Sequence, residues 1–340
     1  MQRFLTLDLK TQRLAMEQAA AAKGLAFVAV EKDFWVCWTL EQLFLLPEIG
    51  GHLTFKGGTS LSKVWELIER FSEDIDLVVD KGWLGFGGEK DPESAPSNES
   101  RKERLKALKT ACGSAVRGSI QAALRAAFQA ALPTGREWEL AMDPDDKDQQ
   151  TLLFSYPRLA TDTTGYLGPW VKIELGARSD IDPAREGTVR SEVAAAFPQL
   201  FDEPAVKLRA LEPERTFLEK AMLLHEESFR PPDKPRAQKL ARHYYDVARL
   251  IQAGVGQRAL ASPGLFERVV AHRRVYFKQT WVDYDTMVRG SICLVPHESR
   301  MTAWAQDYDA MQREMFYGTP PAWSEVVEVV AQWERRFNHP

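Results

Sequence analysis

The pattern of apolar residues predicts two helices near the N-terminus, over 11–22 and 31–46. Along EKDFWVCWTLEQLFLL (31–46) the apolar positions recur at steps of three and four residues, at Val36, Cys37, Leu40, Leu43 and Phe44. This spacing places them on one face of a helix, which we expect to pack against the segment that follows.

A compact unit of strand, turn, helix and strand is predicted next, from HLTFKGGTSLSKVWELIERFSEDIDLVVD. The first strand ends at Phe55, and a glycine turn leads into a helix of about ten residues. A second strand runs through Val79 after a turn at 70–72. The helix and the tight turn bring the second strand back beside the glycine turn.

The next part of the chain combines a loop, a long helix and two strands. Gly, Pro, Ser and charged residues concentrate in 82–100, which predicts a weakly ordered loop. A long Ala-rich helix is expected over 100–131, and strands are expected over 151–157 and 170–176.

Beyond VKLRALEP the pattern is helical throughout. Helices are expected over 214–227, 236–252 and 265–279, and two more near the C-terminus. We therefore expect an α+β fold with a border near residue 212. Residues 1–211 would form an α/β domain with N-terminal helices, and residues 212–340 would form a helical domain.

Composition and charge narrow the function classes. The chain of 340 residues is 44% hydrophobic and 27% charged, which is typical of a globular protein and excludes intrinsic disorder. Its 44 Lys and Arg against 48 Asp and Glu give a net charge of −4, so a phosphate-rich partner needs a local basic patch. No apolar run reaches the roughly 18 residues of a membrane helix, and no secretory signal is present. We expect a cytoplasmic protein without a membrane partner.

Two aspartates are the sharpest candidate for metal chemistry. The three Cys and six His have no metal-ligand spacing, so a metal would be a hard cation on carboxylates, which indicates magnesium. Asp74 and Asp76 in SEDIDLVVD stand two apart on a predicted strand and therefore point to the same face. Two adjacent carboxylates repel each other unless a cation lies between them. The alternative is an acidic pair on a solvated strand face.

The glycine turn is a candidate phosphate site. Gly57 and Gly58 precede Thr59 and Ser60 at the start of the predicted helix, where free backbone N–H groups and hydroxyls meet. The alternative is a plain turn with Thr59 or Ser60 as the helix N-cap. The return of the acidic strand favours phosphate binding, because a triphosphate on the glycines would meet metals on the aspartates.

Further candidates lie on a later strand and on the C-terminal helices. Lys172 and Glu174 share one face of VKIEL, and Glu174 would be the third carboxylate of a two-metal site. The alternative is an exposed Lys and Glu strand face. Lys220 shares the apolar face of its helix, where it either binds a phosphate or extends its ammonium to water. Arg242 and Asp246 are four apart and can form a helix ion pair.

Two stretches are basic against the acidic average, 230–249 and 267–281. In the second, Arg273, Arg274 and Lys278 are interleaved with aromatic residues, as on surfaces that bind a nucleic-acid backbone. The alternative is an amphipathic helix with a solvated basic face.

Several blocks of the chain resemble the AbiEii/AbiGii-type nucleotidyltransferase toxins, a branch of the polymerase-beta-like nucleotidyltransferase superfamily. FKGGTSLSK followed by IERFSEDIDL resembles the first motif of this family. The other blocks follow in the family's order over nearly the whole chain: VEKDFWV, VKIEL, FLEKAMLLHE, RHYYDVARL, WVDYDTM, GSICLVP and DYDAMQREMFYG. The resemblance implies a minimal nucleotidyltransferase mixed sheet with flanking helices, and a C-terminal helical domain that closes the active cleft.

The resemblance also implies roles for single residues. Gly57, Gly58 and Ser60 would hold the nucleotide phosphates, Ser72 would border the site, and Asp74 and Asp76 would carry magnesium. Lys172 and Glu174 match the second motif, Lys220 the third as a phosphate-binding lysine, and Asp246 the fourth as an aspartate near the substrate. Many relatives have Arg-Asp at the start of the last block, where this chain has Arg242 and His243.

The function implied is transfer of a nucleoside monophosphate from an NTP to an acceptor hydroxyl through two magnesium ions. The acceptor would be RNA, as in relatives that act on the 3′ end of tRNA, held by Arg242, Arg273, Arg274 and Lys278. The chain would be the toxin of a toxin–antitoxin or phage-defence system and would have a separate antitoxin partner. One alternative acceptor is a small-molecule or protein hydroxyl. A non-catalytic protein that senses nucleotides is a third hypothesis, which the intact set of acidic residues disfavours.

Overall fold

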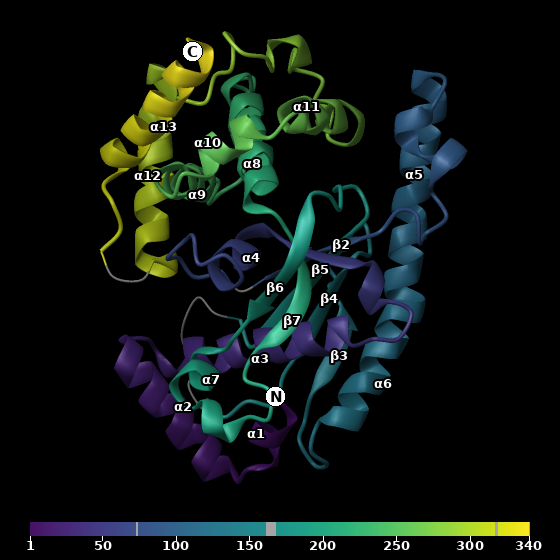
Figure 1. Cartoon of the computed structure of the whole chain (residues 1–340), viewed down its shortest axis with the longest axis vertical. Helices are drawn as coiled ribbons and strands as arrows, with labels where there is room; N and C mark the ends of the chain where they lie inside the picture. The colour runs from purple at the N-terminus through teal and green to yellow at the C-terminus, as the bar shows by residue number, and fades with distance from the viewer. Residues whose placement is uncertain (73, 161–167, 317–318, 340) are drawn as a thin grey trace. The chain divides into compact units, whose positions relative to one another are not determined.

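The chain forms a mixed sheet surrounded by helices, followed by a helical part (Figure 1). The structure is a computed structural model that describes residues 1–340 except 73, 161–167, 317–318 and 340, and not the side chains of 313 and 314. In the described residues seven strands form one sheet, in the order β3-β4-β5-β2-β1-β7-β6. The predicted α+β fold is confirmed.

The sheet contains both parallel and antiparallel strand pairs. β1 is antiparallel to β2 and parallel to β7, β2 is parallel to β5, and β4 is antiparallel to both β5 and β3. The strand bounds are β1 Leu53–Lys56, β2 Ile75–Val79, β3 Glu139–Met142, β4 Thr151–Ser155, β5 Trp170–Gly176, β6 Ala184–Val189 and β7 Val206–Leu211. The predictions for β1, β2, β4 and β5 are confirmed, whereas β3, β6 and β7 were not predicted.

The predicted helices of the sheet-bearing part are present with shifted bounds, and α1 and α7 were not predicted. A π-helical turn, Val116–Ile120, joins α5 to α6, so the two follow each other as one long helix (Figure 1). The bounds are α1 Gln2–Thr6, α2 Leu9–Lys23, α3 Phe27–Phe44, α4 Gly57–Lys63, α5 Asn98–Ala115, α6 Gln121–Ala131 and α7 Glu192–Ala196. α3 is buried on all sides over most of its length, and not on one face as predicted.

One face of the sheet carries the apolar core. Phe154 of β4 packs with its ring centroid 4.4 Å from that of Phe128 on α6 and 5.6 Å from that of Trp38 on α3. Strand alternation puts Ile173 of β5 on the same face as Phe154, since Leu152 pairs with Ile173. The opposite face of β2 and β5 is left for polar side chains.

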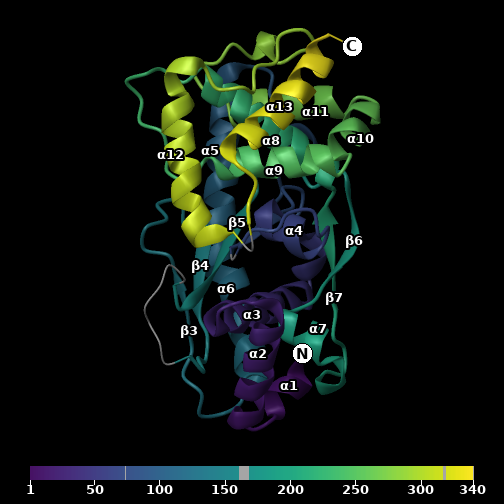
Figure 2. The same cartoon turned by 90° about the vertical axis from the view of Figure 1, so that its left-hand side faces the viewer.

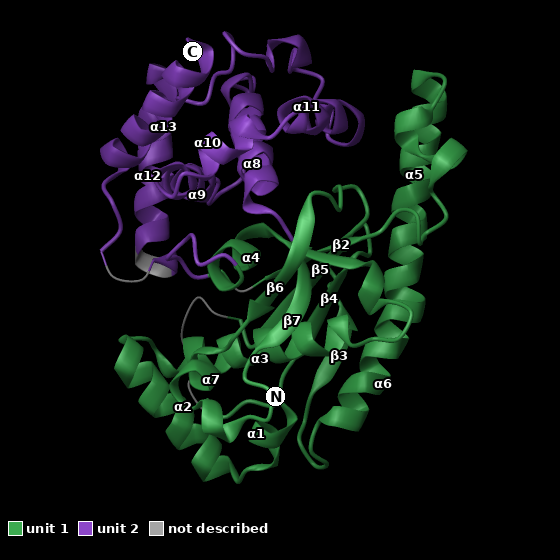
Figure 3. Cartoon of the chain, in the orientation of Figure 1, with its two compact units in different colours: residues 1–64, 72–210 green, residues 65–71, 211–340 purple. Residues whose placement is uncertain are grey.

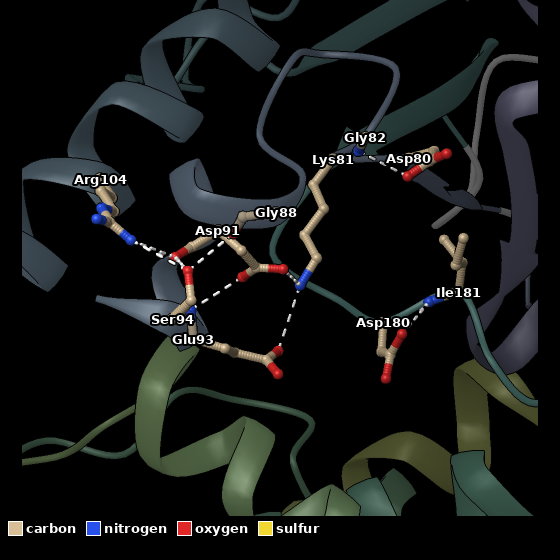
Figure 4. A network of polar contacts seen from close by, with 10 residues as sticks. All are labelled: Asp80, Lys81, Gly82, Gly88, Asp91, Glu93, Ser94, Arg104, Asp180 and Ile181. Atoms are coloured by element: carbon tan, nitrogen blue, oxygen red, sulfur yellow. Dashed lines mark hydrogen bonds and ion pairs between the residues drawn. The ribbon is translucent and has the colours of Figure 1, made fainter. Parts of the chain in front are cut away.

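The segment 82–100 is more structured than predicted. It contains two 3₁₀ turns, Gly88–Lys90 and Pro92–Ser94, and the start of α5. Lys81 Nζ lies 2.8 Å from Asp91 Oδ2 and 3.3 Å from Glu93 Oε1, and Arg104 donates to the Asp91 carbonyl oxygen at 2.9 Å (Figure 4). These contacts fix the backbone without an apolar core, which is why composition alone predicted a loop.

The chain divides into two compact units (Figure 3). The first comprises 1–64 and 72–210, and the second comprises 65–71 and 211–340. The border after residue 210 lies near the predicted one, but 65–71 was assigned to the first domain by sequence and clusters with the second unit. That the second unit closes a cleft remains a prediction.

The second unit is helical, as Figure 2 shows from the side. Its helices are α8 Pro213–Ser228, α9 Arg242–Gln252, α10 Val255–Ala261, α11 Leu265–Tyr276, α12 Glu298–Met315 and α13 Trp323–Asn338. α9 starts six residues later than the periodicity suggested, and α10 was not predicted. Among the described residues, no helix has the length and apolarity needed to cross a membrane.

Candidate functional site

Gly57 begins α4 directly after β1 and lies against Asp76. Its φ is +77°, in the left-handed region that L side chains rarely adopt. A Cβ at this position would lie 2.0 Å from Asp76 Oδ2 and 2.9 Å from Asp76 Cβ. Both the backbone and the carboxylate therefore require glycine here. The predicted glycine turn is present, but it opens a helix of seven residues, shorter than predicted.

The side chains that follow in α4 point inward. Thr59 and Ser60 are buried. Thr59 Oγ1 donates to the carbonyl oxygen of Asp74 at 2.6 Å and lies 2.9 Å from Ser72 Oγ, so it fixes the turn before β2. Ser60 Oγ has no hydrogen-bond partner among the described residues. The Thr59 hydroxyl is thus used within the protein, and its role as a nucleotide ligand stays a prediction.

Asp76 and Glu174 lie side by side on neighbouring strands, and we call them the carboxylate pair. β2 and β5 run parallel with Asp76 paired to Glu174, and β1 pairs Lys56 with Asp76. Directly paired residues lie on the same face of a sheet, so these three side chains form a row on its polar face. The sequence predicted both Asp74 and Asp76 on this strand. In the structure β2 begins at Ile75, so Asp76 lies on the strand and Asp74 lies in the turn before it.

The carboxylate pair is electrostatically strained. Burial raises the pKa of Asp76 to about 6, against the lowering effect of the Lys56 ammonium. The charges of Glu174 and Asp74 and a hydrogen bond with Glu174 contribute to the rise. Adjacent carboxylates take up either a proton or a cation, because their charges repel each other.

Lys172 is the nearest cation to Glu174 on β5. Its Nζ lies 2.9 Å from Glu174 Oε1 and 3.8 Å from Asp143 Oδ2. The buried residues Val171, Ile173 and Leu175 alternate with Lys172 and Glu174, which confirms that the two share a strand face.

The carboxylate pair suits magnesium better than it suits a metal ion whose ligands all come from the protein. In the described residues, no group of three or more His, Cys, Asp or Glu side chains is arranged to hold a metal ion. Magnesium does not need such a cage, because it keeps waters and binds through one or two carboxylates together with substrate phosphates. The carboxylates of Asp76 and Glu174 are hard oxygen ligands whose mutual repulsion a divalent cation would relieve.

α4 is fixed at its C-terminal end by buried charges. Lys63 forms an ion pair with buried Asp33 of α3, and its Nζ lies 3.0 Å from Oε1 of Glu192 in α7. Asp33 Oδ2 also accepts a hydrogen bond from the Glu192 backbone N–H at 2.6 Å. α4 and its glycines are therefore held to two other helices of the first unit.

In the second unit, Asp246 of α9 binds two cations. Arg70 Nε and Nη2 each lie 2.7 Å from one of its oxygens, and Lys220 Nζ lies 2.9 Å from Oδ2. Burial alone would raise the pKa of Asp246, but Arg70 and Lys220 hold it well below its usual range. Among the described residues, Asp246 is thus partnered by Arg70 and Lys220, and not by Arg242 as the helix spacing suggested.

Lys220 is buried and does not extend to water. Its Nζ lies 3.4 Å from Nδ1 of His243. Burial and the Lys220 charge hold the pKa of His243 well below its usual range, so the imidazole is neutral near pH 7. The pKa of Lys220 is lowered by burial, against the raising effect of Asp246.

The stretch 267–281 is only partly a basic surface. Arg273 is buried, with Nε 2.8 Å and Nη2 2.5 Å from the two oxygens of Glu226. Arg273 would have to break this pair to contact an acceptor, and its role in acceptor binding stays a prediction. Arg274 is bound to Asp285 at 2.7 Å but keeps 43% of its side chain exposed, and Lys278 is exposed.

Three residues near these clusters were missed by sequence reasoning. Lys56 stands directly before Gly57 and two residues after Thr54 on the predicted strand. Strand alternation therefore places it on the same face as Thr54, and this was the signal that could have found it. The sequence contains no signal for Arg70 or Asp143, because their partners Asp246 and Lys172 are far away along the chain.

Comparisons with known proteins concern the family and the fold of the chain. The profile of the family described as "Nucleotidyl transferase AbiEii toxin, Type IV TA system" matches residues 38–329. Among solved structures, the fold is similar to MenT4, a nucleotidyltransferase toxin from Mycobacterium tuberculosis H37Rv, with a TM-score of 0.51 and 15% sequence identity. The match covers 96% of this chain and 90% of that one. None of the curated proteins matches the chain in sequence.

Proposed function

Because the chain belongs to the family of AbiEii nucleotidyl transferase toxins of type IV toxin–antitoxin systems, we propose that it moves a nucleoside monophosphate from an NTP to an acceptor hydroxyl. The observation that supports this is the carboxylate pair, Asp76 and Glu174, on the polar sheet face directly beside Gly57. Hard oxygen ligands next to a glycine, which has no side chain of its own, suit a metal-bound triphosphate.

We propose that Asp74, Asp76 and Glu174 hold magnesium, as two ions, together with phosphate oxygens of the triphosphate, because the three carboxylates by themselves do not form a metal cage among the described residues. Bound there, the metal would neutralise the triphosphate and lower the pKa of the acceptor hydroxyl. Asp76 and Glu174 would hold it from neighbouring strands, and Asp74 from the turn before β2. The Thr59 hydroxyl donates a hydrogen bond to the carbonyl oxygen of Asp74 and so helps to position Asp74.

Other residues of the first unit would bind the phosphates. Gly57 and Gly58 allow the backbone to approach them closely, and Ser60 and Ser72 would border them. Lys172 would balance charge on the pyrophosphate that leaves, since a fixed cation stabilises a developing anion.

We assign Lys220 to phosphate binding and Asp246 to positioning. Both oxygens of Asp246 are engaged by Arg70 and Lys220, so its carboxylate is not available as a base or metal ligand. It instead fixes the ammonium of Lys220 and favours its charged form.

RNA, at the 3′ end of tRNA, is the acceptor we propose. Arg242, Arg274 and Lys278 are the candidates for its phosphates, since Arg274 and Lys278 are exposed and Arg242 is partly so. Cations on a surface can bind a nucleic-acid backbone without reading its sequence.

A hydroxyl of a small molecule or a protein is the second candidate acceptor. The observation that favours it is the burial of Arg273, His272 and Tyr276 within the basic stretch. The Trp281 ring has Lys234 Nζ 4.1 Å from its centroid, so this face is not free to stack on a base.

The family also implies a separate antitoxin as partner. We propose that the pair acts in the cytoplasm, where NTP and tRNA occur, and that it serves phage defence.

The acceptor is identified by incubating the purified chain with each α-labelled NTP, Mg²⁺, and either total tRNA or a tRNA-free extract. Label in tRNA that is lost in Asp76→Asn supports the RNA proposal. Label only in small molecules or protein would replace it with the second candidate.

A further inference from the structure

Lys172 stands between a carboxylate of the proposed metal site and one outside it. Its Nζ lies 2.9 Å from Glu174 Oε1 and 3.8 Å from Asp143 Oδ2, and the charge of Asp74, another carboxylate of the proposed metal site, also acts on it. Lys172 keeps 34% of its side chain exposed and has room to move, whereas Asp143 keeps 12%. The shorter contact places the ammonium on Glu174.

Asp143 is fixed in place and presents one oxygen to Lys172. Its Oδ1 accepts a hydrogen bond from the Asp145 backbone N–H at 3.0 Å. Its own N–H donates to the Thr151 carbonyl oxygen at 3.0 Å, which extends the pairing of β3 with β4 by one residue. Oδ2, the oxygen nearer Lys172, takes part in neither bond. Asp143 is therefore a prepared second partner for the ammonium.

A divalent cation on Glu174 and an ammonium on the same carboxylate repel each other. The repulsion between cations a few ångströms apart is large at a half-buried site, where water screens it poorly. Either the metal stays away or Lys172 leaves Glu174. Asp143 is the carboxylate to which it can turn without leaving the polar face of the sheet.

We propose that Lys172 is a counter-ion displaced by metal, which moves from Glu174 to Asp143 when a divalent cation binds the carboxylate pair. Asp143 is then a positioning residue that makes metal binding less costly and holds Lys172 beside the site. This inference rests on the proposed function, because it requires Glu174 to be a metal ligand.

The test is a double-mutant cycle on metal affinity, with Mn²⁺ alone as the probe and no nucleotide. We would measure Mn²⁺ binding by electron paramagnetic resonance for the parent, Asp143→Asn, Lys172→Met and the double variant. Asn at 143 keeps an acceptor for the Asp145 N–H and removes only the charge. Asp145→Asn is the matched control, because it removes a charge from the same turn.

Asp143→Asn is expected to weaken Mn²⁺ binding about two- to fivefold in the parent, the range of a partly exposed ion pair. Lys172→Met is expected to tighten binding, because no cation then competes for Glu174. In the Lys172→Met background Asp143→Asn should have almost no effect, and Asp145→Asn should have little effect in either background. A structural role of Asp143 would change the melting temperature without this dependence on Lys172.

Equal weakening by Asp143→Asn in both backgrounds would overturn the inference, because Asp143 would then act only through its charge. A parent that binds no Mn²⁺ at millimolar concentration would overturn the proposed metal site as well, so the two failures are distinguishable. Lys172→Gln and Asp143→Ser replace any variant that does not fold.

Discussion

Replacing Gly57 by alanine is expected to destabilise the chain by about 2–5 kcal/mol and to abolish nucleotide transfer. The left-handed φ of +77° costs an L residue about 1–2 kcal/mol. The new Cβ would lie 2.0 Å from Asp76 Oδ2, where ordinary contacts are 3.4–4 Å. Rotating the carboxylate does not remove the overlap, because Asp76 Cβ is itself 2.9 Å away. α4 or β2 must shift, which adds about 1–3 kcal/mol.

Gly24→Ala is the matched control for this variant. Gly24 also has a left-handed φ, +64°, but a Cβ there meets nothing within 4 Å. It should therefore cost only the backbone strain and leave transfer intact. Urea unfolding without metal measures the stability of both variants, and labelled NTP measures transfer. If Gly57→Ala is as stable as Gly24→Ala and remains active, then Gly57 does not pack closely against Asp76.

Further predictions concern the other charged groups. Lys220→Met should weaken NTP binding about 10- to 150-fold, as expected for a lost charge-assisted contact of about 1.5–3 kcal/mol. Unchanged affinity in equilibrium dialysis would exclude a phosphate contact. Arg273→Met should destabilise the fold by about 3–5 kcal/mol, because it leaves Glu226 buried without its cation. Lys278→Met should change the free energy of unfolding by no more than about 0.5 kcal/mol. Equal melting temperatures of the two variants would refute the buried pair. Between pH 4 and 7 the metal-free protein should lose stability as pH rises, because the raised pKa of Asp76, about 6, makes the folded state hold more protons than the unfolded state. This pH dependence should shrink in Asp76→Asn, and an unchanged slope would assign it to other groups.

Apolar alternation supported the prediction of β5, but β7, Val206–Leu211, has a similar alternation and was missed. In β5 the buried Val171, Ile173 and Leu175 alternate with polar residues, so the face carrying Glu174 could be predicted. β6, Ala184–Val189, is mostly exposed and its polar sequence has no alternation, so no period signals it.

The candidate site was predictable where it depends on local geometry. Gly57 and Asp76 belong to one strand, helix and strand unit, whose short connections bring them together. The pairs of Arg70 with Asp246 and of Arg273 with Glu226 depend on tertiary packing between distant segments. Sequence periodicity describes one element at a time and cannot find such partners.

Whether the carboxylate pair supports nucleotidyl transfer can be measured by incubating the chain with α-labelled or γ-labelled NTP, Mg²⁺ and total RNA. We expect label to enter the acceptor only from the α-phosphate and pyrophosphate to be released in equal amount. Both signals should vanish in Asp76→Asn while its fold persists. Transfer of the γ-label, or full transfer by Asp76→Asn, would contradict this role of the carboxylate pair.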